Sequence, residues 1–193
     1  MLRHTSCAIA LFALAIAPAV QVHAQAPADR WGQFRGTAGL HGTSAAALPD
    51  QLKVIWTYEA GDAIDSSAAI VDGVVYVGAA TGELHAVNLA DGKGKWKYRA
   101  SADGIGESSP AVAGGLVYIG DLAGVLHAVD AATGKAAWTF KTGGEIRSSP
   151  VMVDGVMLVG DAAALVELHL HPEPLHVPGD VGTAAVDDHR VHT

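Results

Sequence analysis

The chain has 193 residues, of which 50% are hydrophobic and 17% are charged, and its formal net charge at pH 7 is −8. A mildly acidic chain whose charges are spread along its length does not suggest nucleic acid or an anionic membrane surface as a partner. Its single cysteine, Cys7, lies close to the N-terminus, so the rest of the chain has to fold without disulfide bonds.

Residues 1–24 have the pattern of a cleaved export signal. Arg3 supplies a positive start, an apolar run covers residues 8–20, and residues 22–24 (VHA) form a small-x-small cleavage site. The run is shorter than the ~20 residues that a membrane-spanning helix needs. Cys7 precedes the run and does not follow the cleavage point, which argues against a lipoprotein. We therefore expect a periplasmic or secreted protein without a transmembrane span.

Residues 25–50 are interpreted as a lead-in to the repeats that follow. The stretch 29–44, DRWGQFRGTAGLHGTS, is rich in glycine and contains Trp31 and Phe34. This composition predicts a loop whose aromatic side chains cover an apolar surface.

Residues 51–59, QLKVIWTYE, are predicted to form a strand. Val54, Trp56 and Tyr58 fall on one face at period two. We interpret this segment as the outer strand of a blade whose other three strands do not precede it.

A repeat of about 40 residues occupies residues 51–160. Two copies cover residues 65–98 and 107–142, and a third begins at Arg147 and loses the pattern after Gly160. A period of ~40 is typical of the four-stranded blades of a propeller.

Each copy divides into four short strands. In the second copy they are expected at residues 109–113, 116–120, 125–130 and 136–141, with glycine-containing turns between them. The connections are short, which makes neighbouring strands antiparallel, and residues 164–170 could pair as a third strand of the third copy. The predicted fold is therefore all-β: a partial β-propeller of four-stranded antiparallel blades, about two and a half blades plus one orphan strand, followed by an irregular tail.

Propellers have about four to eight blades. A partial one would form an open arc with exposed apolar blade faces and strand edges, so we expect marginal stability or self-association through these faces.

A recurring signature in each copy combines a small residue, a turn former, a glycine and a tryptophan. The turn former can bond backbone amides, and the glycine takes a conformation that a side chain forbids. The indole can then dock on the neighbouring blade and bury a large apolar area. The positions concerned are Ala86, Asn88, Gly92 and Trp96 in the first copy, Ala128, Asp130, Gly134 and Trp138 in the second, and Trp56 ahead of both.

The spacing Ala-x-Asp-x-x-Thr-Gly-Lys-x-x-Trp resembles the tryptophan-docking repeat of pyrroloquinoline-quinone (PQQ) type β-propellers. The Ser-Ser-Pro opening of the repeats is similar as well, and residues 31–36 (WGQFRG) resemble the Trp-x-Gln-x-Arg-Gly lead-in of exported members. The resemblance covers residues 31–160.

The resemblance implies one of two classes of function. One is a non-enzymatic propeller that binds a protein in the cell envelope, similar to the propeller subunit of the outer-membrane β-barrel assembly machinery. The other is part of a quinoprotein dehydrogenase, whose family holds PQQ and Ca²⁺ with carboxylate and amide ligands and a vicinal disulfide. The chain has no Cys-Cys pair, and no ligand residue of that family matches a position here. We therefore expect a binding or scaffold module without a cofactor, partnered by an envelope protein or by missing blades.

Asp65, Glu107 and Arg147 occupy equivalent positions, each just before a pair of serines. Near the channel mouth they would form a ring of mixed charge that could contact a ligand, and the alternative is a solvated rim. His85 and His127 are equivalent to each other and are interpreted as structural. The serine pairs are expected to bond backbone, because a nucleophile needs an oriented base beside it. No catalytic residue is assigned.

Residues 161–193 depart from the repeat, because they are rich in histidine and contain no aromatic residue. So abrupt a change indicates a truncated or frame-shifted reading frame, and the alternative is a divergent capping tail. His169, His171 and His176 resemble a metal-binding pattern. Structural zinc needs four convergent ligands, so no metal is expected.

Overall fold

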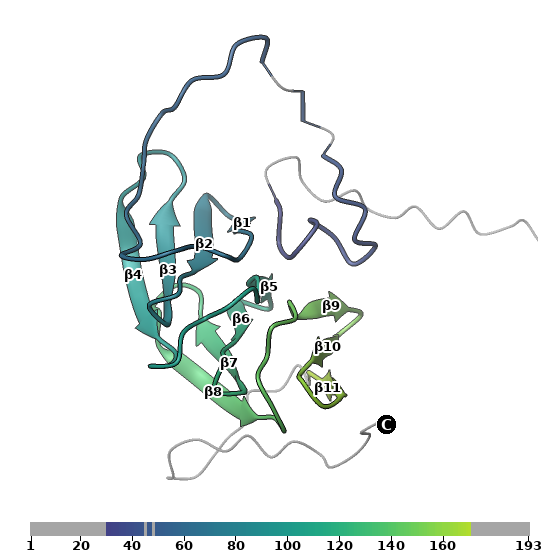
Figure 1. The fold of residues 1–193 in the computed structure, drawn as a ribbon. Coiled ribbons are helices and arrows are strands. Elements are labelled where there is room, and N and C mark those ends of the chain that lie inside the picture. Colours follow the sequence, from purple (N-terminus) through teal and green to yellow (C-terminus); the bar gives the residue numbers. More distant parts are fainter. Residues whose placement is uncertain (1–29, 45, 48, 171–193) are drawn as a thin grey trace, which may run out of the picture.

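The computed structural model describes residues 30–44, 46–47 and 49–170. They form three antiparallel sheets and contain no helix, and hence none long and apolar enough to cross a membrane. The sheets stand side by side as blades of an open arc (Figure 1). The prediction of an all-β partial propeller is confirmed. The predicted signal at 1–24 and the predicted irregular stretch beyond Leu170 lie outside the described residues.

The three blades follow one another in chain order. Blade 1 consists of β1 (Ala69–Val71), β2 (Val74–Gly78), β3 (Glu83–Asn88) and β4 (Gly94–Arg99). Blade 2 consists of β5 (Ala111–Ala113), β6 (Leu116–Gly120), β7 (Val125–Asp130) and β8 (Ala136–Lys141). Blade 3 consists of β9 (Val151–Val153), β10 (Val156–Gly160) and β11 (Leu165–His169). Each strand pairs with the next, so every sheet is a simple meander.

Strands β6, β7 and β8 have the predicted bounds. The inner strand β5 begins at Ala111 and not at Ser109, because Pro110 lacks an N–H and the Ser109 N–H bonds to the next blade. The pairing considered for residues 164–170 forms as β11, which continues blade 3 beyond Gly160.

The hairpins between the two inner strands of each blade use residues that tolerate positive φ. Asp72 and Gly73 have φ of 51° and 73°, and Asp154 and Gly155 repeat the arrangement in blade 3 with 49° and 81°. Two consecutive residues at positive φ match the twist of the flanking strands, which explains the Asp-Gly pairs in the sequence.

The hydrophobic core lies between blades. One cluster joins blade 1 to blade 2 around Leu84, Ile105 and Ile119, and a second joins blade 2 to blade 3 around Leu126 and Met157. Blade 2 is therefore covered on both faces, and the four central residues of β7 are all buried. In β11 only one residue is buried, because the described residues place a blade on only one of its faces.

The strand prediction for residues 51–59 is corrected by the structure. The segment runs along blade 1 but belongs to no β-ladder, and Leu52, Val54 and Ile55 are exposed. The reason is that the described residues contain no strand beside it that could complete the hydrogen bonding. Trp56 and Tyr58 still turn toward blade 1, as described below.

Candidate functional site

The first serine of each pair links two parts of its own blade. In blade 1 the Ser66 hydroxyl donates to the carbonyl of Gly78 at 3.1 Å and accepts from the Gly78 N–H at 3.2 Å. The same two bonds join Ser148 to Gly160, and the Ser108 hydroxyl accepts from the Gly120 N–H at 3.1 Å. These hydroxyls are engaged with backbone groups, as the sequence interpretation expects.

The second serine of each pair links one blade to the next. The Ser67 N–H donates to Ser109 Oγ at 2.9 Å, and the Ser109 N–H donates to Ser149 Oγ at 2.9 Å. The result is a ladder of serines along the inner ends of the three blades. The ladder links neighbouring blades, and it can form because the serine pair recurs at the same position of each repeat.

Arg147 is the centre of a charged cluster at the position for which the sequence predicts a channel mouth. Its guanidinium lies 3.1 Å from Glu107 and 2.9 Å from Glu145, and all three side chains are at least half exposed. A hydrogen bond from its own backbone N–H and one from Arg147 lower the pKa of Glu107, while Glu145 and Glu107 raise the pKa of Arg147. Exposed pairs of this kind contribute little to stability, because water and salt screen them.

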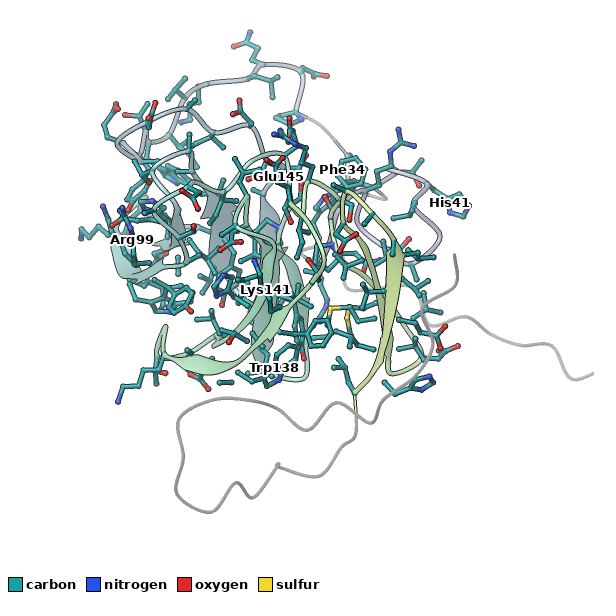
Figure 2. All side chains as sticks on the ribbon, turned by 60° about the horizontal axis from the view of Figure 1, so that its bottom comes forward. Phe34, His41, Arg99, Trp138, Lys141 and Glu145 are labelled. Carbon is teal, nitrogen blue, oxygen red and sulfur yellow. The ribbon has the colours of Figure 1, made fainter. Side chains whose placement is uncertain are left out.

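The structure thus brings together two of the three residues predicted for the channel mouth. Asp65 is exposed and contacts neither Glu107 nor Arg147. Glu145 is a member that sequence reasoning missed, because the equivalent positions in the other blades, Ala63 and Gly104, carry no charge. Figure 2 shows Glu145 and Trp138 well apart: Trp138 lies within β8, and Glu145 lies in the loop that follows Lys141.

Tryptophans of the outer strands contact the following blade. The Trp96 indole N–H, from β4 of blade 1, donates to the carbonyl of Ala131 in blade 2 at 3.0 Å. Trp56 makes the equivalent bond to Leu89 of blade 1 at 2.8 Å. Trp138 in β8 packs against Tyr118, with ring centroids 5.8 Å apart, and the described residues offer its N–H no acceptor.

The turn residues of the signature support these indoles. Gly134 has φ of 72°, and a Cβ added there would lie 2.6 Å from Cδ2 of Trp96. Gly92 faces Trp56 in the same way. The turn former Asp130 accepts from the Thr133 N–H at 2.7 Å.

The other members of the signature hold the turn and its strand in place. Asn88 Oδ1 accepts from the Ala90 N–H at 2.8 Å. Ala86 and Ala128 are fully buried, lie opposite Trp96 and Trp138, and adjoin a register shift in each blade. A small side chain fits at this crowded position next to the indole ring.

A buried chain of polar side chains connects blade 1 to blade 2. The carboxylate of Asp121 only accepts, so Nε2 of His127, 3.0 Å from it, carries a proton. In the neutral ring Nδ1 then accepts from the Tyr98 hydroxyl, also at 3.0 Å. Burial and the charge of Asp121 raise the pKa of Tyr98. Sequence reasoning found the histidine but missed its partners, although the Trp-x-Tyr repeat was a signal for them.

His85 has a related but less complete environment in blade 1. Its Nδ1 lies 3.0 Å from the Tyr58 hydroxyl, and its Nε2 lies 3.7 Å from Glu83. Burial lowers the pKa of His85, Lys97 lowers it further, and Glu83 acts in the opposite direction. Both histidines lie where one blade meets the outer strand of the preceding blade.

The lead-in crosses the inner strands of all three blades. Trp31 exchanges two backbone hydrogen bonds with Ile70 of β1, each 2.7 Å long. The next two lead-in residues reach β5 and β9: the Val112 N–H donates to the Gly32 carbonyl at 2.7 Å, and the Met152 N–H donates to Gln33 Oε1 at 3.0 Å. The sequence predicted this loop, but no feature of WGQFRG indicated that it bonds one blade after another.

Of the three histidines with a metal-like pattern, only His169 is among the described residues. It is exposed, and its Nε2 lies 2.8 Å from Glu167. His171 and His176 lie outside the described residues.

The described residues do not fit a quinone with a calcium ion. Calcium takes six to eight oxygen ligands. No group of three or more His, Cys, Asp or Glu side chains converges in the part of the chain that the structure describes. The carboxylates of Glu107 and Glu145 are both bound to Arg147, and the lead-in lies on the inner strands.

Comparison with known proteins identifies the repeat. A family model described as outer membrane protein assembly factor BamB (PQQ_2) matches residues 43–171, more than half of the chain. The chain belongs to this family. No curated protein sequence matches it.

Solved propellers resemble this BamB-type chain. BamB from Moraxella catarrhalis is 22% identical, with a TM-score of 0.52 over 63% of this chain and 38% of that one. The quinohemoprotein alcohol dehydrogenase from Comamonas testosteroni is 25% identical, with a TM-score of 0.61 over 69% and 23%. A europium-containing methanol dehydrogenase is 20% identical, with a TM-score of 0.65 over 75% and 31%.

These similarities establish the propeller fold of the BamB-type chain. The matched part spans well under half of each of the three proteins. Both a BamB and two dehydrogenases are among them, so fold alone does not assign an activity.

Proposed function

We propose that this BamB-type chain is an exported, non-enzymatic propeller protein that binds a partner protein in the cell envelope through its channel mouth. One observation carries the proposal: side chains that recur from blade to blade are engaged in contacts within or between blades, whereas the charges at the mouth are exposed. The serines bond backbone and the two buried histidines bond tyrosines. Glu107, Glu145 and Arg147 are polar groups that stay accessible at that end.

The charged cluster suits recognition of a protein. Arg147 holds two carboxylates on the surface with little stabilisation, so a partner can exchange for either of them. Arginine is enriched in the centres of protein interfaces, and complementary charge around it fixes orientation. Asp65 lies before the serine pair of blade 1 and would extend the negative part of this surface. The cluster has one more negative than positive group, which favours a partner with a basic patch.

The test is capture of partners from an envelope extract by the purified chain carrying a photo-cross-linker in place of Glu107. We expect a cross-linked partner whose yield falls about tenfold or more in Glu145→Lys, because a like charge then faces the partner's basic patch. Asp91→Lys makes the same change of charge at an exposed position of the turn between β3 and β4, away from the cluster, and serves as the control. Equal yields from the two variants would contradict the proposal.

The second candidate is part of a quinoprotein dehydrogenase, and the similarity to the dehydrogenase from Comamonas testosteroni favours it. It is tested separately by titrating the purified chain with PQQ and Ca²⁺. Saturable binding that gives a redox-active absorbance would overturn the scaffold proposal. Capture of a partner without either compound would count against the dehydrogenase.

A further inference from the structure

Two contacts recur at both interfaces between described blades. Each contact has two unlike halves, one supplied by the first blade and the other by the next blade. The first is the serine ladder, in which a serine N–H donates to the hydroxyl of the following blade's serine. Because the contact is directional, the two ends of the arc differ. Ser149 has a free N–H at one end, and Ser67 has a free hydroxyl at the other, within the described residues.

The second contact places an isoleucine over a glycine. Ile105 of blade 2 covers Gly78 of blade 1, where an added Cβ would lie 2.6 Å from its Cγ2. Ile146 of blade 3 covers Gly120 of blade 2 in the same way. Ile105 and Ile146 are 1% and 0% exposed. The glycine is thus the socket for the isoleucine of the next blade.

This contact also leaves one unpaired half at each end of the arc. The equivalent isoleucine of blade 1, Ile64, is 46% exposed. The equivalent glycine of blade 3, Gly160, has only Ser148 of its own blade near an added Cβ, at 3.5 Å. Socket and isoleucine are therefore both present in one chain but at opposite ends.

The strands show the same complementarity. Blade 3 has three strands, and no described strand pairs with the outer edge of β11. In residues 51–59, Trp56 bonds to blade 1 as the tryptophan of an outer strand bonds to the next blade. These residues nevertheless belong to no sheet. Figure 1 shows this segment beside β4 and β11 at the other end of the arc, so they do not meet within one chain. Leu165 in β11 and Val54 in the segment are 53% and 81% exposed.

We propose that two copies of this chain close head to tail into a six-bladed propeller, in which residues 51–59 of each copy complete blade 3 of the other. Ile64 of one copy then fills the socket at Gly160 of the other, and the Ser149 N–H donates to Ser67 Oγ across the same junction. Two copies of three blades lie within the four to eight blades that propellers have, whereas three copies would exceed them.

The register of the complete blades defines the new strand pairing. In blade 2, Ala128 lies opposite Trp138 and Leu126 lies opposite Phe140. By the pairing of β10 with β11, Glu167 and Leu165 occupy the positions of Ala128 and Leu126. Trp56 and Tyr58 of the second copy would therefore face Glu167 and Leu165. Glu167 takes the place of the small Ala128, so its exposed side chain has to turn away from the incoming indole. Residues 37–44 lie on the open side of the arc in Figure 1, so closure displaces them while the Trp56 contact stays.

The test is the molar mass of the full chain, purified from an exporting host, by size-exclusion chromatography with light scattering. We expect twice the monomer mass for the unsubstituted chain. Ile64→Asp and Gly160→Val change opposite ends of the arc, and each should raise the dimer Kd about 100-fold or more, because a buried aliphatic contact is lost or blocked. Both sites are open in the single chain, so the blades should still fold.

Ile55→Lys is the matched control. Ile55 is as apolar as Ile64 and more exposed, but its equivalents in complete blades, Lys95 and Ala137, stay exposed. The control should therefore remain dimeric. An equimolar mixture of Ile64→Asp and Gly160→Val should recover a heterodimer held by one intact junction, which an interface that pairs Ile64 with Ile64 of the other copy would not allow.

Three outcomes would overturn the proposal. The first is a monomer at all concentrations up to about 100 µM, the concentration at which even a Kd of 1 µM gives a dimer. The second is an oligomer whose mass neither Ile64→Asp nor Gly160→Val changes. The third is a set of cross-links, mapped by mass spectrometry, that joins residues 171–193 to β11 within one chain, because the chain's own tail would then occupy the edge. The mass measurement needs no envelope partner, so its result is independent of the proposed function.

Discussion

At the scale of single residues, the buried histidines, which are the residue type most often used in catalysis, here link parts of the structure to one another. The Tyr98–His127 pair joins the outer strand of blade 1 to blade 2, the Tyr58–His85 pair joins residues 51–59 to blade 1, and the carboxylate of Asp121 completes the first of them. A buried histidine needs such partners, because an unpaired polar group in the core is destabilising. Recurrence in the sequence was therefore a sign of structure and not of catalysis.

The environment of His85 predicts a loss of stability in mild acid. Its pKa is lowered in the folded state, mainly by burial, so below its ordinary value of about 6.5 the unfolded chain binds more protons than the folded chain. The contribution of His85 is fully present above that value and is lost as pH falls through it. We expect the urea midpoint to fall between pH 7.5 and pH 5.5, and to fall less in His85→Gln, whose amide can still accept from Tyr58.

His41→Gln replaces an exposed histidine of the lead-in and is the control for this titration. It should retain the pH dependence of the unsubstituted chain. The lowered pKa values of Glu107 and Asp130 act only at more acidic pH, outside the window of the measurement. The same pH dependence in His85→Gln as in the unsubstituted chain would refute this account of His85.

At the scale of elements, the turn between β7 and β8 serves as the receptor for the outer strand of blade 1. The Ala131 carbonyl accepts from both the Trp96 indole and the Tyr76 hydroxyl, at 3.0 and 3.3 Å. Burial is the main cause that raises the pKa of Tyr76. One short turn thus fixes the position of two strands of the neighbouring blade.

The contribution of this turn can be isolated with two glycine substitutions. Gly134 and Gly73 have φ of 72° and 73°, but an added Cβ meets Trp96 at Gly134 and nothing within 4 Å at Gly73. Gly73→Ala should cost about 1 kcal/mol in the free energy of unfolding, from backbone conformation alone. Gly134→Ala should cost about 2–4 kcal/mol, because the indole must also move. Equal costs in urea unfolding would show that the indole contact contributes nothing.

The sequence predicts those elements whose signals are local. Strands β6 to β8 have their predicted bounds, because Asp-Gly and Gly-Gly turns and period-two patterns delimit them. Residues 51–59 carry the same local pattern but form no strand, because a strand also needs a neighbour. The cluster around Arg147 was only partly predicted. Glu145 lies in the loop after β8, and the other two repeats have no charged residue at the equivalent position.

At the scale of the whole molecule, the arc is held by contacts between neighbouring blades. Blade 2 has a core cluster on each face, and blades 1 and 3 have one each. In repeat architectures stability is close to a sum of such neighbour terms, so the middle unit is the most stable. The lead-in adds a link across all three blades at their inner strands.

Amide hydrogen exchange tests this account of the arc most directly. It is measured by mass spectrometry on Ile64→Asp, so that association between copies does not contribute. We predict that the amides of β6 and β7 exchange most slowly and that those of β10 and β11, which have a neighbouring blade on one face only, exchange much faster. Equally slow exchange in β10–β11 and in β6–β7 would contradict the claim that contacts between blades hold the molecule together.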